Sequence, residues 1–185
     1  MKTEGYDQFP LPLVFLCVSA TVSIYAIGAY LIAPMGIISV ALYLLFCLGM
    51  EIRVLITGCR DCYYFGKLCA FGRGKICSLL FEKGIPERFI EKKISWKSLV
   101  PDFLVSIVPI FTGGLYLFTN FSWERLVMIL AFGVIAFPLT GFIRGSISCR
   151  YCKQKEFGCP AIQFFSKNNP NTCCAQPGAQ TDPKK

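Results

Sequence analysis

The sequence predicts an all-α protein: a four-span transmembrane helical bundle, built as two tandem two-helix units, with a cysteine-rich cytoplasmic cap. Three features of the chain support this prediction. Hydrophobic residues make up 54% of the 185 residues and charged residues only 16%, a composition too apolar for an ordinary soluble domain. The apolar residues are concentrated in four blocks, and a spaced cysteine pattern follows the second and the fourth block.

Each of the four blocks is suited to cross a membrane as a helix. None contains a charged residue, and they comprise residues 9–34, 35–50, 103–121 and 126–143. A spanning helix needs roughly 20 apolar residues, so the shorter second block is expected to continue to about Ile56. The first block is longer than the ~7–15 apolar residues of a signal peptide and follows no basic segment, so we expect a retained anchor.

The charged residues at the ends of the blocks are interpreted as headgroup residues. Glu51 and Arg53 can reach the membrane surface by snorkelling, and Asp102 lies at the start of the third block. Charges cost little at that depth compared with the middle of the bilayer, so no ion path is predicted from them.

The distribution of Lys and Arg predicts the orientation in the membrane. Residues 51–98 contain ten of these cations and residues 144–185 contain seven, whereas the connections at 33–36 and 120–125 contain one between them. The positive-inside rule places both basic segments and both termini in the cytoplasm of a multi-pass plasma-membrane protein. The anionic headgroups of the bilayer are the partner expected for these segments, and no nucleic-acid partner is expected.

The predicted organisation has five segments along the chain. In order they are spans one and two, a cysteine segment with a basic interfacial helix beginning at Pro86, spans three and four, a second cysteine segment, and a tail expected to be disordered: residues 1–57, 58–98, 99–145, 146–166 and 167–185. Pro109 and Pro138 are expected to kink spans three and four, because proline interrupts the helical hydrogen-bond ladder.

The same cysteine pattern, C-x2-C-x6-C, occurs twice. The first frame is Cys59, Cys62 and Cys69, and the second frame lies 90 residues later, at Cys149, Cys152 and Cys159. A C-x2-C turn lets two thiolates bind one ion, and a structural zinc site needs four ligands. The equal spacing of the frames therefore predicts metal ligation rather than packing, whereas Cys17 and Cys47, which lie within spans, are expected to be packing residues.

Several cysteines could complete the ligand set. Cys77 is the natural fourth ligand for the first frame, and Cys173 or Cys174 for the second. Alternatively, the two C-x2-C pairs could meet in one four-thiolate site. The candidate metal ligands are the frame cysteines and Cys77, with one tail cysteine auxiliary: Cys59, Cys62, Cys69, Cys77, Cys149, Cys152 and Cys159.

The absence of histidine narrows the metal chemistry. Catalytic zinc usually relies on imidazole ligands and an open position. Ligation by thiolates alone favours structural zinc or an iron–sulfur cluster, and the sequence leaves these two cofactors undecided. No catalytic residue is predicted.

Residues 62–75 (CYYFGKLCAFGRGK) and 152–161 (CKQKEFGCPA) resemble segments of uncharacterised small cysteine-motif integral membrane proteins of anaerobic bacteria and methanogenic archaea. The resemblance covers mainly the two frames. It implies a prokaryotic cell membrane and brings no activity with it.

The sequence thus favours a metal-bearing membrane subunit, structural or electron-transferring, that works with a membrane or cytoplasmic protein partner. Two alternatives stay open: a transporter of soft metal ions or small solutes, and a membrane thiol–disulfide oxidoreductase. A cytoplasmic location argues against persistent structural disulfides among the frame cysteines.

Overall fold

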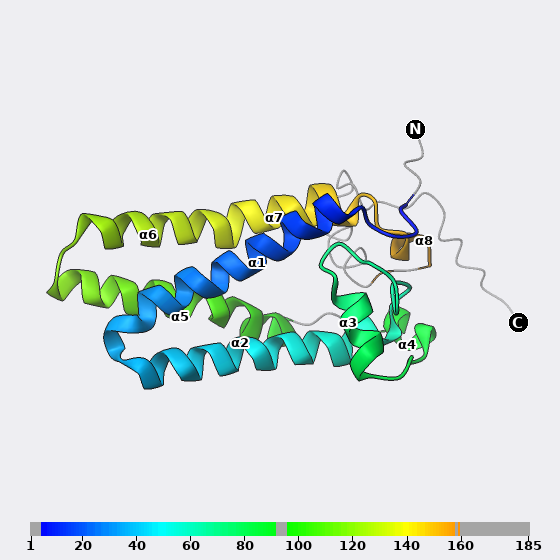
Figure 1. Cartoon of the computed structure of the whole chain (residues 1–185), viewed down its shortest axis with the longest axis horizontal. Helices are drawn as coiled ribbons and strands as arrows, with labels where there is room; N and C mark the ends of the chain where they lie inside the picture. Colours follow the sequence, from blue (N-terminus) through cyan, green and yellow to red (C-terminus); the bar gives the residue numbers. More distant parts are fainter. Residues whose placement is uncertain (1–4, 92–95, 158, 160–185) are drawn as a thin grey trace, which may run out of the picture.

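Four long helices make up most of the protein in the computed structural model, which describes residues 5–91, 96–157 and 159 (Figure 1). The long helices are α1 (Leu11–Ile32), α2 (Ile37–Thr57), α5 (Trp96–Thr119) and a fourth that begins as α6 (Trp123–Val134). The fourth helix continues through a π-helical turn, α7 (Thr140–Phe142) and a second π-helical segment (Ile143–Cys149). The short helices are α3 (Arg73–Leu80), α4 (Pro86–Glu91) and α8 (Gln154–Phe157). No β-strand occurs in the described ranges.

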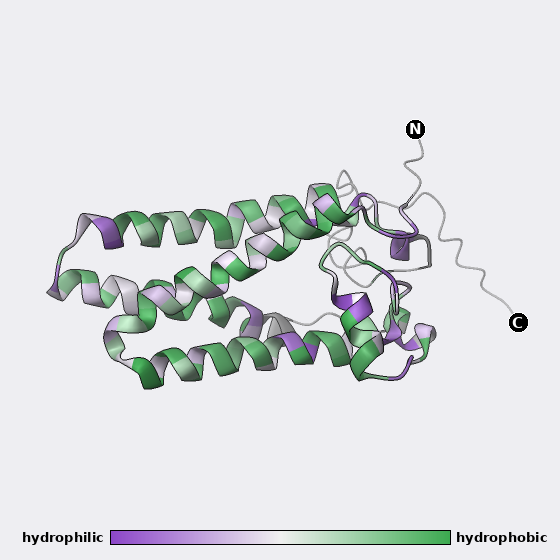
Figure 2. Ribbon diagram, viewed as in Figure 1, coloured by the Kyte–Doolittle hydropathy of each residue, from purple (hydrophilic) through white to green (hydrophobic). Residues whose placement is uncertain are grey.

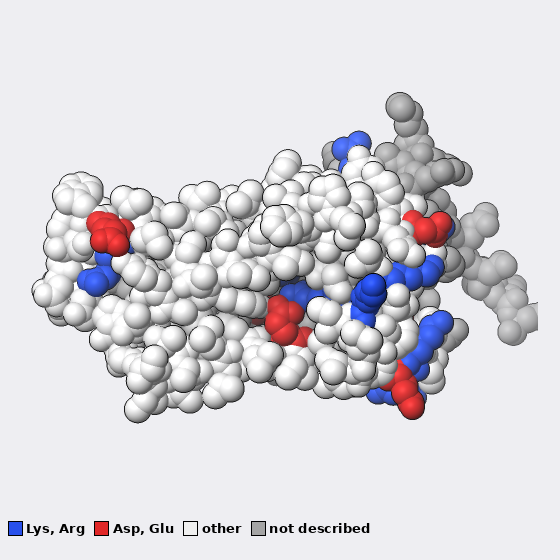
Figure 3. Space-filling view, viewed as in Figure 1, with Lys and Arg blue, Asp and Glu red and all other residues white. Residues whose placement is uncertain are grey.

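The four long helices have the length and composition of membrane spans, which confirms the predicted all-α fold with four spanning helices. The candidate spans are Leu11–Met35, Ile37–Asp61, Val100–Thr119 and Trp123–Cys149. Apolar residues predominate along the four long helices between their ends (Figure 2). On the face seen in Figure 3, charged atoms gather towards the two ends of the molecule and in one recess between them.

The fourth span is longer than its apolar block. The block ends at Ile143, yet the helix continues to Cys149, so it carries the first cysteine of the second frame. A helix needs apolar side chains only within the hydrocarbon, and its backbone hydrogen bonds can continue beyond it into the polar residues that follow Ile143.

Local sequence explains where the helices begin, turn and change their hydrogen bonding. Gly36 closes the turn between α1 and α2 at a φ of 102°, a left-handed conformation that favours glycine. The α-helical pattern gives way to a π-helical turn, Ile135–Leu139, around Pro138, whose missing N–H interrupts the helical hydrogen-bond ladder. The kink expected at this proline stays a prediction. At Pro109, by contrast, α5 remains α-helical.

The predicted interfacial helix is described only in part. Helix α4 begins at Pro86, as predicted, and ends at Glu91. Residues 92–95 of the predicted basic helix lie outside the described residues. So do Cys173, Cys174 and the whole predicted tail.

Helix α1 lies against α2, α5 and α6, and the core of the bundle forms around it. The buried side chains of this core come from all four long helices: Ile24, Leu31, Ile32, Tyr43, Cys47, Met50, Val105 and Phe132. Cys47 is 2% exposed and Cys17 is fully buried, which agrees with the packing role predicted for both.

The closest helix–helix approach that requires a small residue is at Gly28 of α1. A Cβ atom there would lie 2.3 Å from the hydroxyl oxygen of Tyr43. That hydroxyl donates a hydrogen bond to the carbonyl of Val105 at 3.1 Å, so one phenol connects α2 to α5 beside α1. Gly28 therefore sets the spacing of three helices.

We expect Gly28→Ala to destabilise the bundle by about 1–3 kcal/mol, because the added methyl group displaces Tyr43 from Val105. Thermal unfolding of the purified protein in detergent measures this effect. The matched control is Gly49→Ala on α2, where the added methyl group meets nothing within 4 Å. Equal melting temperatures for the two variants would contradict the proposed packing.

Candidate functional site

Both cysteine frames lie at the same end of the helices. Helix α1 begins, α2 ends, α5 begins and the fourth helix ends there, next to α3, α4 and α8 (Figure 1). The turns between α1 and α2 and between α5 and α6 lie at the opposite end. The antiparallel order of the helices thus brings together two segments that are 90 residues apart in sequence.

The two frames begin with matching turns. In the first, the amide of Cys62 donates to the carbonyl of Cys59 at 3.4 Å, and in the second, that of Cys152 donates to Cys149 at 3.3 Å. The next turn matches as well: Phe65 donates to Cys62 at 3.1 Å and Lys155 to Cys152 at 3.3 Å. Each C-x2-C pair is thus held by the same kind of local hydrogen bond, and a second turn of the same kind follows it.

The phenol of Tyr64 connects the frames to the N-terminal segment. Its hydroxyl donates to the carbonyl of Tyr6 at 2.5 Å and accepts the backbone N–H of Lys153 at 2.9 Å. The Tyr64 residue is only 3% exposed, and burial raises its phenol pKa. The backbone of Tyr6 also donates to the carbonyl of Tyr151 at 2.9 Å. Three chain segments therefore meet at one buried oxygen.

Gln154 makes the direct contact between a frame thiol and the other frame. Its side-chain oxygen accepts the backbone N–H of Tyr63 at 2.6 Å and lies 3.6 Å from the Cys62 thiol, which donates to it. Gln154 is 4% exposed. The Cys62 thiol is thus oriented by a residue two positions beyond Cys152.

Two further cysteines of the first segment have partners close by in the chain. The Cys69 sulfur accepts the backbone N–H of Gly74 at 3.4 Å. The Cys77 thiol is fully buried and donates to the carbonyl of Leu55 at 3.5 Å, and burial raises its pKa. Gly74 has no room for a side chain, because a Cβ atom would lie 2.1 Å from the carbonyl oxygen of Tyr64.

The frames supply suitable donors for a thiophilic metal but not a finished coordination site. The described cysteines form no disulfides. Among the described residues, however, no three His, Cys, Asp or Glu side chains are arranged to hold a metal ion. Ligation would therefore require the thiols to rotate towards a common point and lose their protons.

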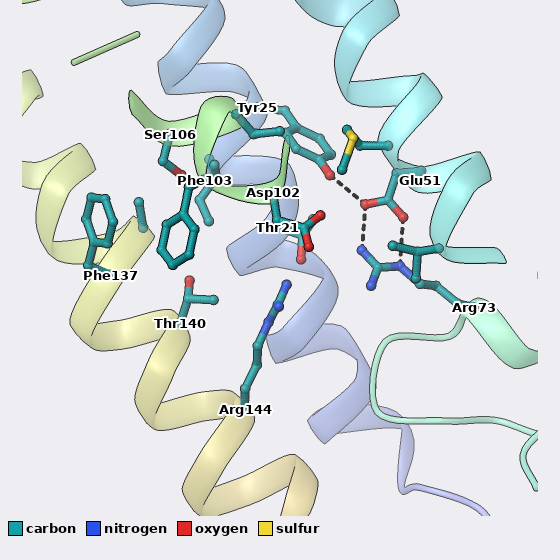
Figure 4. A pocket seen from close by; sticks show the side chains of 15 residues that line it. Thr21, Tyr25, Glu51, Arg73, Asp102, Phe103, Ser106, Phe137, Thr140 and Arg144 are labelled. Carbon is teal, nitrogen blue, oxygen red and sulfur yellow. Dashed lines mark hydrogen bonds and ion pairs between the residues drawn. The ribbon is translucent and has the colours of Figure 1, made fainter. Parts of the chain in front are cut away.

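A second polar site, which the sequence did not predict, lies between the spanning helices. The carboxylate of Glu51 accepts two hydrogen bonds from the Arg73 guanidinium, at 2.7 and 2.6 Å, and one from the Tyr25 hydroxyl at 2.5 Å (Figure 4). Burial disfavours the Arg73 cation, yet the hydrogen bonds and charge of Glu51 outweigh it and raise the Arg73 pKa. Glu51 is thus paired with Arg73 and Tyr25 between the helices, and it does not extend to the headgroups by snorkelling, as the sequence had suggested.

No sequence signal identifies this ion pair. Arg73 is the first residue of α3, 22 residues beyond Glu51, and its charge also fits the positive-inside pattern. The pair lines a cavity of about 310 Å³ whose other walls come from α1, α5 and the fourth helix. Asp102 and Arg144 also line this cavity.

Comparisons with known proteins add no functional assignment. No protein-family model matches the chain, and neither the curated proteins nor the solved structures searched gave a match. The resemblance of the two frames to cysteine-motif membrane proteins therefore stays a prediction.

We expect Tyr64→Phe to loosen the contact between the frames without unfolding the bundle. Loss of the hydroxyl removes the hydrogen bond that the Lys153 amide donates to Tyr64, so hydrogen exchange at Lys153 should accelerate roughly tenfold. Exchange mass spectrometry of the peptide containing Lys153 measures this change. Tyr63→Phe is the control, because its hydroxyl contacts the side chains of Asp7 and Lys67 and accepts no hydrogen bond from the Lys153 amide. Unchanged exchange in Tyr64→Phe would refute the connecting role of the phenol.

We expect Cys62 and Cys152 to react slowly with iodoacetamide at pH 7 once any metal has been removed by a chelator. Burial raises the pKa of Cys62 to about 11 and that of Cys152 to about 12. The thiolate fraction at pH 7 is then about 100-fold or more below that of a free thiol. The labelling rate should rise about tenfold per pH unit up to about pH 11 for Cys62.

Peptide mass spectrometry over a pH series measures the two labelling rates. The same protein unfolded in denaturant is the control, because its thiols should titrate near the ordinary value of about 8.5. Fast labelling of either cysteine at pH 7 in the folded protein would contradict the expected burial effect.

Proposed function

We propose that the protein is an integral membrane protein whose two cysteine frames bind a metal through thiolates on the cytoplasmic side, as structural zinc or an iron–sulfur cluster. In this proposal it serves as a structural or electron-transferring subunit beside a membrane or cytoplasmic partner. The frame cysteines are the primary ligands, and Cys77 is auxiliary in the first segment. The observation on which the proposal chiefly rests is the hydrogen bond between the Cys62 thiol and Gln154, which joins the two frames at one end of the bundle.

Two properties of the frames support a metal centre over the alternatives. Their matching turns present both C-x2-C pairs in the same local geometry, as expected of a repeated ligand unit. Tyr64, Tyr151 and Phe9 belong to the same apolar cluster as Cys62, Cys69 and Cys152, and these aromatic side chains can limit the access of water to a bound centre. A buried thiol is a poor nucleophile, but a metal ion can displace its proton, because metal binding and thiol deprotonation are coupled.

The cytoplasmic orientation rests on the charge distribution. The segments that carry the frames hold most of the cations of the chain, and the opposite end holds Glu124 and Arg125 near the turn between α5 and α6. The positive-inside rule then assigns the frames to the cytoplasm, where glutathione and thioredoxin keep thiols reduced and available to a metal.

We expect protein purified without oxygen to contain stoichiometric metal, and replacement of Cys62 and Cys152 by Ser to remove most of it. Elemental analysis gives the metal and its stoichiometry, and a visible absorption band distinguishes an iron–sulfur cluster from colourless zinc. Cys47→Ser is the matched control, because Cys47 is buried in the bundle core, away from the frames. One metal per chain would indicate a shared site, and two would indicate one site for each frame.

Other results would favour the alternative functions. If the purified protein folds and contains no metal, the proposal that the frames bind a metal is contradicted. If, in addition, one frame cysteine reacts quickly at neutral pH, a thiol–disulfide oxidoreductase is favoured. Loss of metal or solute uptake on deletion of the gene, without a bound metal in the purified protein, would favour a transporter.

A further inference from the structure

The cavity between the spanning helices has a charge pattern that the thiol chemistry does not explain. Four charged residues line it: Glu51, Arg73, Asp102 and Arg144. Charged side chains within spans are costly, and they usually face a partner or a ligand. A charged residue of the lining that has no partner within the protein therefore indicates which ligand group the cavity can bind.

Glu51 and Arg73 satisfy one another. Their bidentate ion pair, with the Tyr25 hydroxyl as a third contact, uses both carboxylate oxygens, and the two side chains are only 24% and 16% exposed. This pair is electrically neutral and forms one wall of the cavity. A second cavity, of about 230 Å³, lies next to the same pair, between α1, α2 and the residues from Phe71 to Ile76.

Asp102 and Arg144 are the remaining charged residues of the lining. Asp102 comes from the first turns of α5, and Arg144 from the last π-helical segment of the fourth helix. In Figure 4 the Arg144 guanidinium points towards the Asp102 carboxylate. Within the described part of the chain, neither residue forms an ion pair or a hydrogen bond with the other or with a third side chain. A cation and an anion thus face the same space without direct contact.

The space around these two charges combines polar and apolar walls. The hydroxyl-bearing residues Thr21, Ser106 and Thr140 line the cavity near them, and Phe103 and Phe137 lie on the side away from Glu51 (Figure 4). A volume of about 310 Å³ lies at the lower end of the range of small-molecule pockets.

We infer that this cavity binds a small zwitterion with an apolar side group. The anionic group of the ligand pairs with Arg144, its ammonium group pairs with Asp102, and its apolar part lies against Phe103 and Phe137. A ligand with one charge would leave the opposite residue unpaired in a site of low polarity, which is costly. A ligand with both charges satisfies Asp102 and Arg144 at once. The inference does not depend on metal binding by the frames.

Two sources can supply this ligand chemistry: a free amino acid, and the phosphate and ammonium groups of a phosphatidylethanolamine headgroup. The first arm of the test uses the full chain in detergent without added lipid. The probe is leucine, and the two comparison ligands keep its carbon skeleton but lack one charge each: 4-methylpentanoate has only the carboxylate, and 3-methylbutylamine only the ammonium. We expect leucine to bind roughly tenfold or more tighter than either analogue.

Variants assign each charge of the ligand to a residue. Arg144→Gln should remove the advantage of leucine over 3-methylbutylamine, and Asp102→Asn should remove its advantage over 4-methylpentanoate. Arg125→Gln is the matched control, because it removes a cation from the opposite end of the same helix, where Arg125 lies over the ring of Tyr116. Thermal unfolding of each variant, measured without ligand, shows that it still folds.

The second arm measures retained lipid by native mass spectrometry after reconstitution into nanodiscs of phosphatidylethanolamine and phosphatidylglycerol. Leucine binding lost in Arg144→Gln and Asp102→Asn supports a free zwitterion. Retained phosphatidylethanolamine, lost in the same two variants but not in Arg125→Gln, supports a headgroup in the same site. If neither ligand binds, or if the single-charge analogues bind as tightly as leucine, the inference is overturned, whatever the metal content of the protein.

Discussion

The position of both cysteine frames depends on one buried hydroxyl, that of Tyr64. It accepts an N–H from the second frame segment and donates to the carbonyl of Tyr6, so three distant parts of the chain share one oxygen. Aromatic packing of Tyr6 against Tyr151 and of Phe9 against Tyr64 excludes water from these bonds and strengthens them. Other contacts that join the two segments are those of Gln154 with Cys62 and Tyr63, and those of Asp7 with Tyr63 and Lys153.

The ion pair of Glu51 and Arg73 also fixes the segment of the first frame, because it joins the start of α3 to α2. Arg73 opens α3, only four residues after Cys69, and its guanidinium extends back into the bundle to a carboxylate on α2. A charge pair of this kind must be nearly complete in its hydrogen bonds to be tolerated where little water is present, and the Tyr25 hydroxyl adds the third bond. The loop of the first frame is thereby fixed to the spanning helices.

Arg73 therefore connects the two candidate sites. In sequence it lies between Cys69 and the buried Cys77, and its side chain lines the cavity that Asp102 and Arg144 face. The ring of Phe71 lies 5.3 Å from the Arg73 guanidinium and 5.4 Å from that of Arg144, so both cations adjoin one aromatic side chain.

The sequence by itself determined the four long helices, and it predicted that both cysteine frames follow the same end of the bundle. Hydrophobic blocks of membrane length and cysteine spacing act locally, so the spans and the C-x2-C turns follow from neighbouring residues, whereas the π-helical segments of the fourth helix were not predicted. Contacts across the fold were decided only by the tertiary structure. Glu51 pairs with Arg73 because the chain after α2 folds back and places the start of α3 beside this helix. The spacing of apolar residues in the sequence does not indicate this pairing. Hydropathy likewise did not predict that the fourth helix continues from Ile143 to Cys149. Hydropathy reflects which residues prefer lipid, whereas the end of a helix depends on backbone hydrogen bonding.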